Sequence, residues 1–195
     1  MRKYARHPLP EIAETCQLAL DRINWLHDHG PEEELRANPY NSVDPAPSMR
    51  EDDVDKLVEV LMNEEDSLFN RYRAMFSLRN MRTQQSIQGL CKGFSASSAL
   101  FRHEIAFVLG QIADPVSIES LIATLKKDEE HSMVRHECAE ALGAIATPEC
   151  LKVLEEYRTD SERVVRESCD IALDMCEYGN SDQFQYADSL QKVES

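Results

Sequence analysis

Apolar side chains recur at helical spacing through most of the chain. The stripe within residues 101–112 covers about 100° of a helical wheel, as expected for a helix that buries one face. It consists of Phe101, Ile105, Val108, Leu109 and Ile112. The segment that opens at Pro115 places a proline where a first helical turn accepts it, and the segment from Pro148 repeats that design. No alternating strand pattern of convincing length occurs, so the sequence predicts an all-α fold.

The helical segments are copies of one another. LFRHEIAFVLGQIADP at 100–115 and MVRHECAEALGAIATP at 133–148 share Arg, His, Glu, Leu, Gly, Ile and Pro at a constant offset of 33 residues. A third copy lies at 164–176, and a more divergent fourth copy lies at 71–80. Two-helix units that repeat at this period stack side by side. We therefore expect a HEAT-repeat α-solenoid of stacked helix hairpins.

The pattern divides the chain into an array and its flanks. Residues 51–180 carry the repeats and form the expected HEAT-repeat array. Residues 30–50 contain four prolines and break the periodicity, which favours an extended linker. Residues 181–195 follow the last copy as a C-terminal tail.

Residues 1–29 end in an amphipathic helix. Its segment ETCQLALD, at 14–21, resembles ESCDIALD of the third copy, 153 residues later. The separation indicates a higher-order duplication, in which 1–29 is the terminal helix of an upstream half that is missing from the chain. We expect this helix to pack against the array, because its exposed apolar face would otherwise be adhesive. The side chains expected to be buried are Ile12, Cys16, Leu20, Ile23 and Trp25.

Composition narrows the function classes. The formal net charge of −15 argues against nucleic-acid binding, which needs a basic surface, and favours a basic partner, although plain solubility explains it equally well. No segment approaches the roughly 20 apolar residues of a membrane span, and the N-terminus lacks a secretory signal, so a cytoplasmic protein is expected. The six cysteines, none in a CxxC pair, are then reduced thiols, with Cys138 and Cys169 in the core.

Two His-Glu pairs, His103-Glu104 and His136-Glu137, occupy matched repeat positions. Both histidines lie opposite the apolar stripe of their helix, and helices of adjacent repeats are about 8–10 Å apart, so both imidazoles can reach one ion. Mixed imidazole and carboxylate ligands suit non-haem Fe(II), with zinc as the rival metal. Surface ion pairs, inherited by duplication without a function, are the alternative.

Residues beside the pairs also repeat. Gly110 and Gly143 lie two helical turns beyond the histidines, where they would leave room above a metal for oxygen or a substrate chain. An arginine precedes each pair position, and we interpret it as structural, either capping a helix or pairing between repeats. These arginines are Arg71, Arg102, Arg135 and Arg166.

In combination, the two RHE motifs, SVDPAP, RYRAMFSLRN and the ending FQYAD resemble the deoxyhypusine hydroxylase family across essentially the whole chain. The resemblance implies a HEAT-repeat iron enzyme of two halves, in which four His-Glu dyads bind a di-iron centre between the halves. Such enzymes are monooxygenases that use molecular oxygen to hydroxylate the deoxyhypusine side chain of translation initiation factor 5A, which completes hypusine biosynthesis.

By this resemblance, the chain matches the C-terminal half only and carries half of the usual di-iron site. The expected Fe(2+) ligands are His103, Glu104, His136 and Glu137. One glutamate would ligate iron and the other would hold the cationic substrate side chain, and the sequence does not distinguish them. We take Glu104 as the substrate-binding candidate. No catalytic residue beyond the metal ligands is expected.

The missing half leaves more than one functional interpretation open. In the first, the chain is an oxidoreductase whose site is completed by a second copy in a homodimer. In the second, it is an inactive truncated form or a non-catalytic HEAT-repeat interaction module. A generic HEAT scaffold with functionless dyads is the third.

Overall fold

The computed structural model describes residues 1–29 and 38–179. All regular secondary structure within these residues is helical, which confirms the all-α prediction. The α-helices are α1 (Pro10–His29), α2 (Val54–Met62), α3 (Leu68–Met81), α4 (Gln84–Cys91), α5 (Ala99–Ile112), α6 (Ile118–Leu125), α7 (Ser132–Ile145), α8 (Pro148–Tyr157) and α9 (Arg163–Gly179). Short 3-10 helices at Lys92–Ser95 and Pro115–Ser117 follow α4 and precede α6. The expected tail at 181–195 and residues 30–37 of the expected linker lie outside the described residues.

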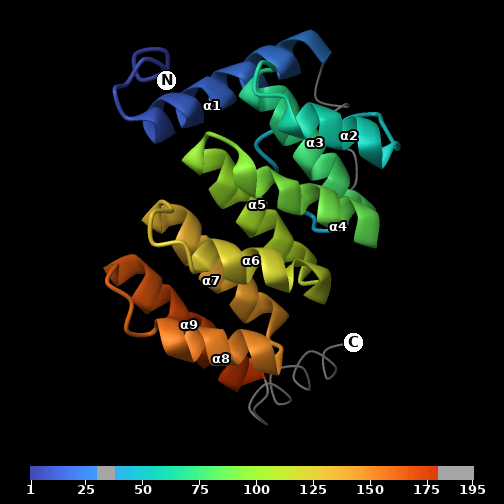
Figure 1. Cartoon of the computed structure of the whole chain (residues 1–195). Coiled ribbons are helices and arrows are strands. Elements are labelled where there is room, and N and C mark those ends of the chain that lie inside the picture. The colour runs from blue at the N-terminus through green and yellow to red at the C-terminus, as the bar shows by residue number, and fades with distance from the viewer. Residues whose placement is uncertain (30–37, 180–195) are drawn as a thin grey trace, which may run out of the picture.

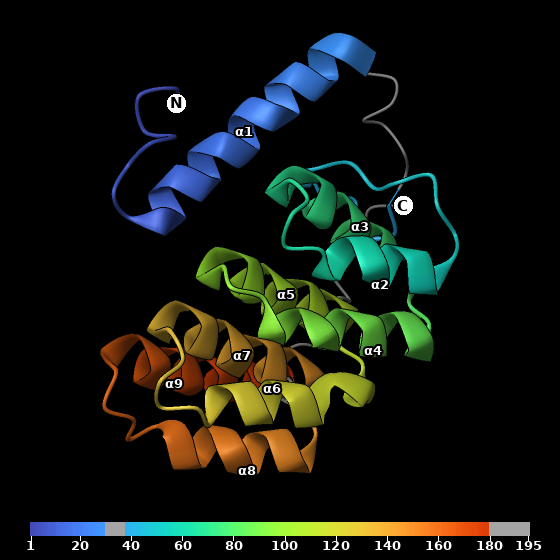
Figure 2. The ribbon, with the colours of Figure 1, turned by 45° about the horizontal axis from the view of Figure 1, so that its top comes forward.

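Helix hairpins stack into a two-layered solenoid (Figure 2). Helices α2, α4, α6 and α8 form one layer, and α3, α5, α7 and α9 form the second layer behind it. Each helix of the second layer packs on the next, with α5 against α7 and α7 against α9. The apolar stripe predicted for 101–112 is buried between the layers, since Phe101, Ile105 and Val108 have no exposed surface. This arrangement confirms the predicted α-solenoid.

The turns between hairpins repeat one local design. Helices α3, α5 and α7 each end at a residue in the left-handed conformation, and a side-chain N-cap follows at once. These pairs are Arg82 and Thr83, Ala113 and Asp114, and Ala146 and Thr147. Left-handed geometry costs a non-glycine residue about 1–2 kcal/mol, whereas a side-chain cap contributes roughly 1 kcal/mol. The cap therefore offsets much of the strain of a sharp turn between repeats.

The recurring arginines fasten each hairpin, as the sequence predicted. The Nε atom of Arg135 donates to the carbonyl of Leu125, 2.8 Å away, and its guanidinium pairs with Asp160 in the next turn. Arg102 likewise donates to the carbonyls of Ala96 and Ser97 and pairs with Glu130. The equivalent bonds of the other two arginines run from Arg71 to Leu61 and Glu64 and from Arg166 to Asp160 and Ser161. The carbonyl bonds hold each hairpin together, and the ion pairs of Arg102 and Arg135 link it to the next repeat.

Residues 38–53 follow the surface of α3 toward α2. Arg79 is fully buried and donates to both carboxylate oxygens of Asp44, at 2.8 and 2.6 Å, and to Gln111 Oε1 in α5, at 2.9 Å. Its guanidinium lies 4.7 Å from the ring centres of Tyr40 and Phe76. This part of the expected linker is thus tied to the array by a buried ion pair and by cation–π contacts.

Helix α1 lies across the α3 and α5 end of the second layer (Figure 1). Its contacts include Leu18, which is 6% exposed, the partly buried Trp25 and a 2.7 Å hydrogen bond from Ser98 Oγ to Glu14. Ile12 and Ile23 are 37% and 53% exposed, so the prediction that they are buried was wrong. The amphipathic pattern identified the helix, but only a narrow face of it meets the array.

Two further expectations concern membranes and thiols. None of the helices within the described part of the chain has the length and apolar character to cross a membrane. Cys138 and Cys169 are buried and free, as predicted. Burial raises the pKa of the Cys169 thiol to about 12, which makes it unreactive at neutral pH.

Candidate metal centre

Close contact between α5 and α7 brings the two predicted histidines together. A Cβ atom on Gly110 would lie 3.1 Å from the Cα of Ala141, so any larger residue here would push α7 away by a few tenths of an ångström. Gly143 has the same relation to Ala172 in α9, where a Cβ atom would lie 2.6 Å from the alanine methyl. The prediction that these glycines leave space for oxygen or substrate was wrong, because the following helix occupies the space beside each glycine.

Three of the four predicted ligands form one cluster. One ligand atom each from His103, His136 and Glu137 lies within 4.8 Å of the others. The Nε2 atom of His103 lies 3.1 Å from Glu137 Oε2, and that of His136 lies 3.9 Å from the same oxygen. The two imidazole centres are 5.5 Å apart. Helix α5 supplies the first residue of the cluster and α7 supplies the other two.

Burial and charge compete at His103. Burial favours the neutral imidazole, but the hydrogen bond and charge of Glu137, together with the charges of Glu104 and Glu140, raise the pKa of His103 above its ordinary value. Its Nδ1 atom is buried and has no hydrogen-bond partner among the described residues. The ring therefore has one nitrogen held by a carboxylate and one nitrogen without a partner.

Glu104 lies beside this cluster without joining it. Burial, reinforced by the charges of Glu137 and Asp44 and opposed by those of His103 and Arg79, raises the pKa of Glu104 to about 7. Burial and the charge of Glu104 also raise the pKa of Tyr72, which occupies the histidine position of the preceding repeat. Glu104 is thus influenced both by the Arg79–Asp44 ion pair and by the charges of His103 and Glu137.

Two residues that sequence reasoning missed contact His136. Glu140 Oε1 lies 3.3 Å from His136 Nδ1, and Ser168 Oγ lies 3.4 Å from the same nitrogen. Ser168 also donates to Glu140, at 3.1 Å. The spacing of four residues between His136 and Glu140 was a usable signal, because such residues are neighbours on a helix. The contact from α9 could be recognised only from the packing of repeats.

This donor set suits a divalent metal ion. Two imidazole nitrogens and one carboxylate oxygen are the combination found in non-haem Fe(II) sites that keep open positions for oxygen. All three side chains are mostly buried yet reachable, with side-chain exposures of 22% for His103, 19% for His136 and 10% for Glu137. The residues present therefore fit one metal ion, held by His103, His136 and Glu137.

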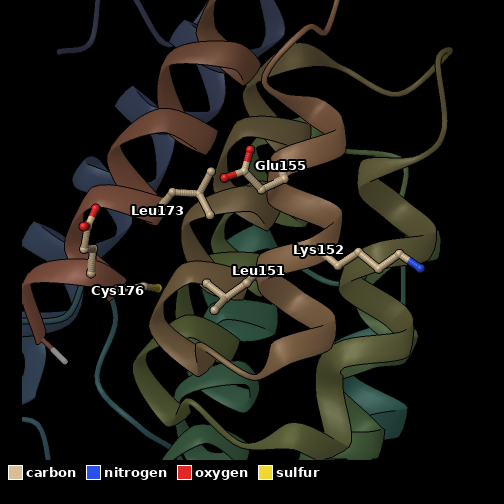
Figure 3. A pocket seen from close by; sticks show the side chains of 6 residues that line it. Leu151, Lys152, Glu155, Leu173 and Cys176 are labelled. Atoms are coloured by element: carbon tan, nitrogen blue, oxygen red, sulfur yellow. The ribbon is translucent and has the colours of Figure 1, made fainter.

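A separate cavity opens between α8 and α9 at the end of the solenoid (Figure 3). Its volume is about 330 Å³, and Leu151 and Leu173 contribute apolar surface to it. The amine of Lys152 points away from the space (Figure 3). None of its lining residues belongs to the histidine cluster, so this cavity adds nothing to the candidate centre.

The sequence is similar to two families of helical repeats and to named relatives. The family described as "HEAT repeats" matches residues 87–174, and the family described as "PBS lyase HEAT-like repeat" matches residues 71–95. The chain is 53% identical to "Deoxyhypusine hydroxylase" of Danio rerio, covering 100% of this chain and 65% of that protein. It is 51% identical to the protein of the same name from Homo sapiens, covering 99% of this chain and 63% of that one.

A solved structure gives the same result. The structure of human deoxyhypusine hydroxylase in complex with glycerol superimposes with a TM-score of 0.87 and 52% identity, covering 91% of this chain and 61% of that chain. The chain thus spans just under two thirds of the length of these relatives. With this degree of identity over its own full length, the chain is a HEAT-repeat homologue of the deoxyhypusine hydroxylases.

Proposed function

We propose that the chain contributes to an iron-dependent monooxygenase that hydroxylates the deoxyhypusine side chain of translation initiation factor 5A. The observation that carries this proposal is the cluster of His103, His136 and Glu137, whose ligand atoms lie within 4.8 Å of one another. The homology supports it, because the relatives of 51–54% identity carry the name of that hydroxylase. The proposed partners are therefore the modified factor and molecular oxygen.

The cluster and the neighbouring Glu104 have separate proposed tasks. His103, His136 and Glu137 would hold Fe(2+), and Glu104 would receive the cationic amine of the substrate side chain. Bound iron would supply the activation of molecular oxygen. The carboxyl of Glu104 is shielded from solvent and lies beside the cluster, which suits the recognition of an isolated positive charge. The net charge of −15 favours the approach of a basic partner.

The centre needs residues from a second surface to become di-iron. The described residues hold one cluster of three ligands, whereas the family resemblance implies four dyads. We propose that the remaining ligands come from a second copy in a homodimer or from the part of the relatives that this chain does not span. The site of action that the sequence favours is the cytoplasm, which cell fractionation can test.

A second candidate function is a non-catalytic HEAT-repeat interaction module, or an inactive truncated form. It is favoured by the coverage of 63–65% of the relatives, since an isolated part of an enzyme can keep its fold and lose its activity. Metal content and mass in solution distinguish the two candidates.

The chain should be loaded with Fe(II) without oxygen and then analysed for iron per chain, mass in solution and turnover of deoxyhypusine-containing factor 5A after oxygen is added. We expect two irons per dimer and a visible absorption band on oxygenation. The His103→Ala, His136→Ala double variant should lose the iron but keep its helicity. A metal-free monomer without turnover would overturn the enzyme proposal and favour the interaction module.

A further inference from the structure

His136 differs from His103 in what surrounds its Nδ1 atom. Glu140 Oε1 and Ser168 Oγ approach it to 3.3 and 3.4 Å, whereas the Nδ1 atom of His103 is buried without a hydrogen-bond partner among the described residues. The reason lies in the sequence. Phe107 takes, four residues after His103, the place that Glu140 takes four residues after His136, so α5 offers no carboxylate there.

Counting hydrogens fixes the direction of these bonds. A carboxylate only accepts hydrogen bonds, and a serine hydroxyl carries a single proton. Ser168 uses that proton in its 3.1 Å bond to Glu140, so its oxygen can only accept from the imidazole. Glu140 and Ser168 are therefore both acceptors toward His136, and the ring must carry a hydrogen on Nδ1. In the neutral imidazole the lone pair is then on Nε2, the nitrogen that faces Glu137.

The three side chains come from two helices and differ in mobility. Ser168 projects from α9 and is 4% exposed, so the packing of the last repeat fixes its hydroxyl. Glu140 is 48% exposed and would be free to rotate without its bond to Ser168. The serine thus anchors the glutamate, and the glutamate orients the imidazole.

We propose that Glu140 and Ser168 are positioning residues that hold His136 as the Nδ1–H tautomer with its Nε2 atom directed into the metal cluster. The role toward a metal rests on the proposed function, whereas the tautomer is a property of the metal-free chain. Outer-shell partners of this kind usually change metal affinity about 10–100-fold when they are removed.

The tautomer can be measured in the metal-free full chain by ring ¹⁵N NMR at neutral pH. Wild type should show His136 with Nδ1 protonated and Nε2 unprotonated. In Glu140→Ala the hydroxyl of Ser168 becomes free to donate to Nδ1, so a substantial Nε2–H population should appear. Glu140→Gln should restore the wild-type spectrum, because its amide oxygen still accepts. Glu167→Ala, next to Ser168 and paired with Arg163, is the matched control and should change nothing.

Anaerobic Fe(II) titration then tests the consequence for metal binding. Glu140→Ala should bind Fe(II) about 10–100-fold more weakly than wild type, with Glu140→Gln closer to wild type and Glu167→Ala unchanged. A wild-type His136 spectrum in Glu140→Ala would overturn the inference, as would an unchanged Fe(II) affinity where the parent chain binds iron. If the parent chain binds no iron, the proposed function fails, and the NMR result alone still decides the tautomer.

Discussion

The Nε2 atom of His103 and the Oε2 atom of Glu137 lie 3.1 Å apart, although the two residues belong to different repeats. Glu104, the sequence neighbour of His103, is not the carboxylate that this nitrogen meets. Ser168, in the glutamate position of the third copy, approaches the other ring nitrogen of His136, with its Oγ atom 3.4 Å from Nδ1. The histidine position of one repeat therefore meets the glutamate position of the next, and the candidate centre is a product of stacking.

This pairing assigns different roles to the two glutamates, with Glu137 binding the metal and Glu104 binding the substrate. Glu137→Gln should weaken Fe(II) binding by at least the 10–100-fold that is usual for outer-shell changes, because it removes the charged oxygen that both histidines face. Glu104→Gln should leave Fe(II) affinity within a few-fold of wild type and raise KM for the deoxyhypusine substrate. Anaerobic titration and steady-state kinetics on both variants provide the measurement. Equal losses of iron in the two variants would contradict the division of roles.

The glycines provide a test of helix packing. Gly143→Ala would place a methyl group 2.6 Å from that of Ala172, so α9 must move away from α7. Overpacking of this kind costs about 1–3 kcal/mol of unfolding free energy, which exceeds the roughly 1 kcal/mol that alanine gains over glycine in a helix. Urea unfolding should show the loss, and Ala172→Gly in the same chain should recover part of it. An unchanged midpoint would show that the contact is looser than the structure indicates.

Periodicity was sufficient to predict the fold. The apolar stripe, the proline starts and the offset of 33 residues determine which face of each helix is buried. Arg135 repeats the bond from guanidinium to backbone carbonyl that Arg102 makes; together with the ion pair of the same arginine, we call this an arginine staple. The apolar stripe, the proline starts and the arginine bonds each belong to a single helix or a single turn, so the sequence of one repeat predicts the structure of the next. The prediction of a solenoid followed without any knowledge of contacts between repeats.

The site depended on contacts that periodicity does not contain. A helical wheel gives the direction of His103 around its own axis, but the residue it meets depends on how far α7 is displaced along α5. That displacement is set by Gly110 against Ala141 and by the arginine staples. The exposure of Ile23 was missed for the same reason, since α1 meets the array over a narrow face.

The staples predict an acid-sensitive stability. Burial alone would raise the pKa of Asp160, but the hydrogen bonds and charge of Arg135 outweigh it and hold that pKa below its ordinary value. A carboxyl with a lowered folded-state pKa contributes stability above the unfolded pKa of about 3.9, and the contribution is lost as pH falls through the folded value. Wild type should therefore lose stability steeply below about pH 4.

Asp160→Asn removes the pH-dependent contribution of this carboxylate to stability. The variant should be less stable than wild type at pH 7, because Arg135 stays buried without its carboxylate, and its urea midpoint should depend less on pH between neutral and acid. Asp174→Asn, at an exposed position of α9, serves as the control and should follow the wild-type profile. Parallel pH profiles for wild type and Asp160→Asn would contradict the assignment.

The docking of α1 rests on Leu18, and this can be tested locally. Leu18→Ala removes the most buried side chain of the helix, for which core substitutions cost about 2–5 kcal/mol. Because α1 packs mainly on α3 and α5 and adds one ion pair, from Glu11 to His131 ahead of α7, the loss should release this helix without unfolding the array. Hydrogen exchange of α1 amides should accelerate while that of α7 amides stays unchanged. Ile23→Ala is the matched control, since Ile23 is 53% exposed and its truncation should shift α1 exchange by no more than about 0.5 kcal/mol. Equal acceleration in both variants would place the docking face on the other side of the helix.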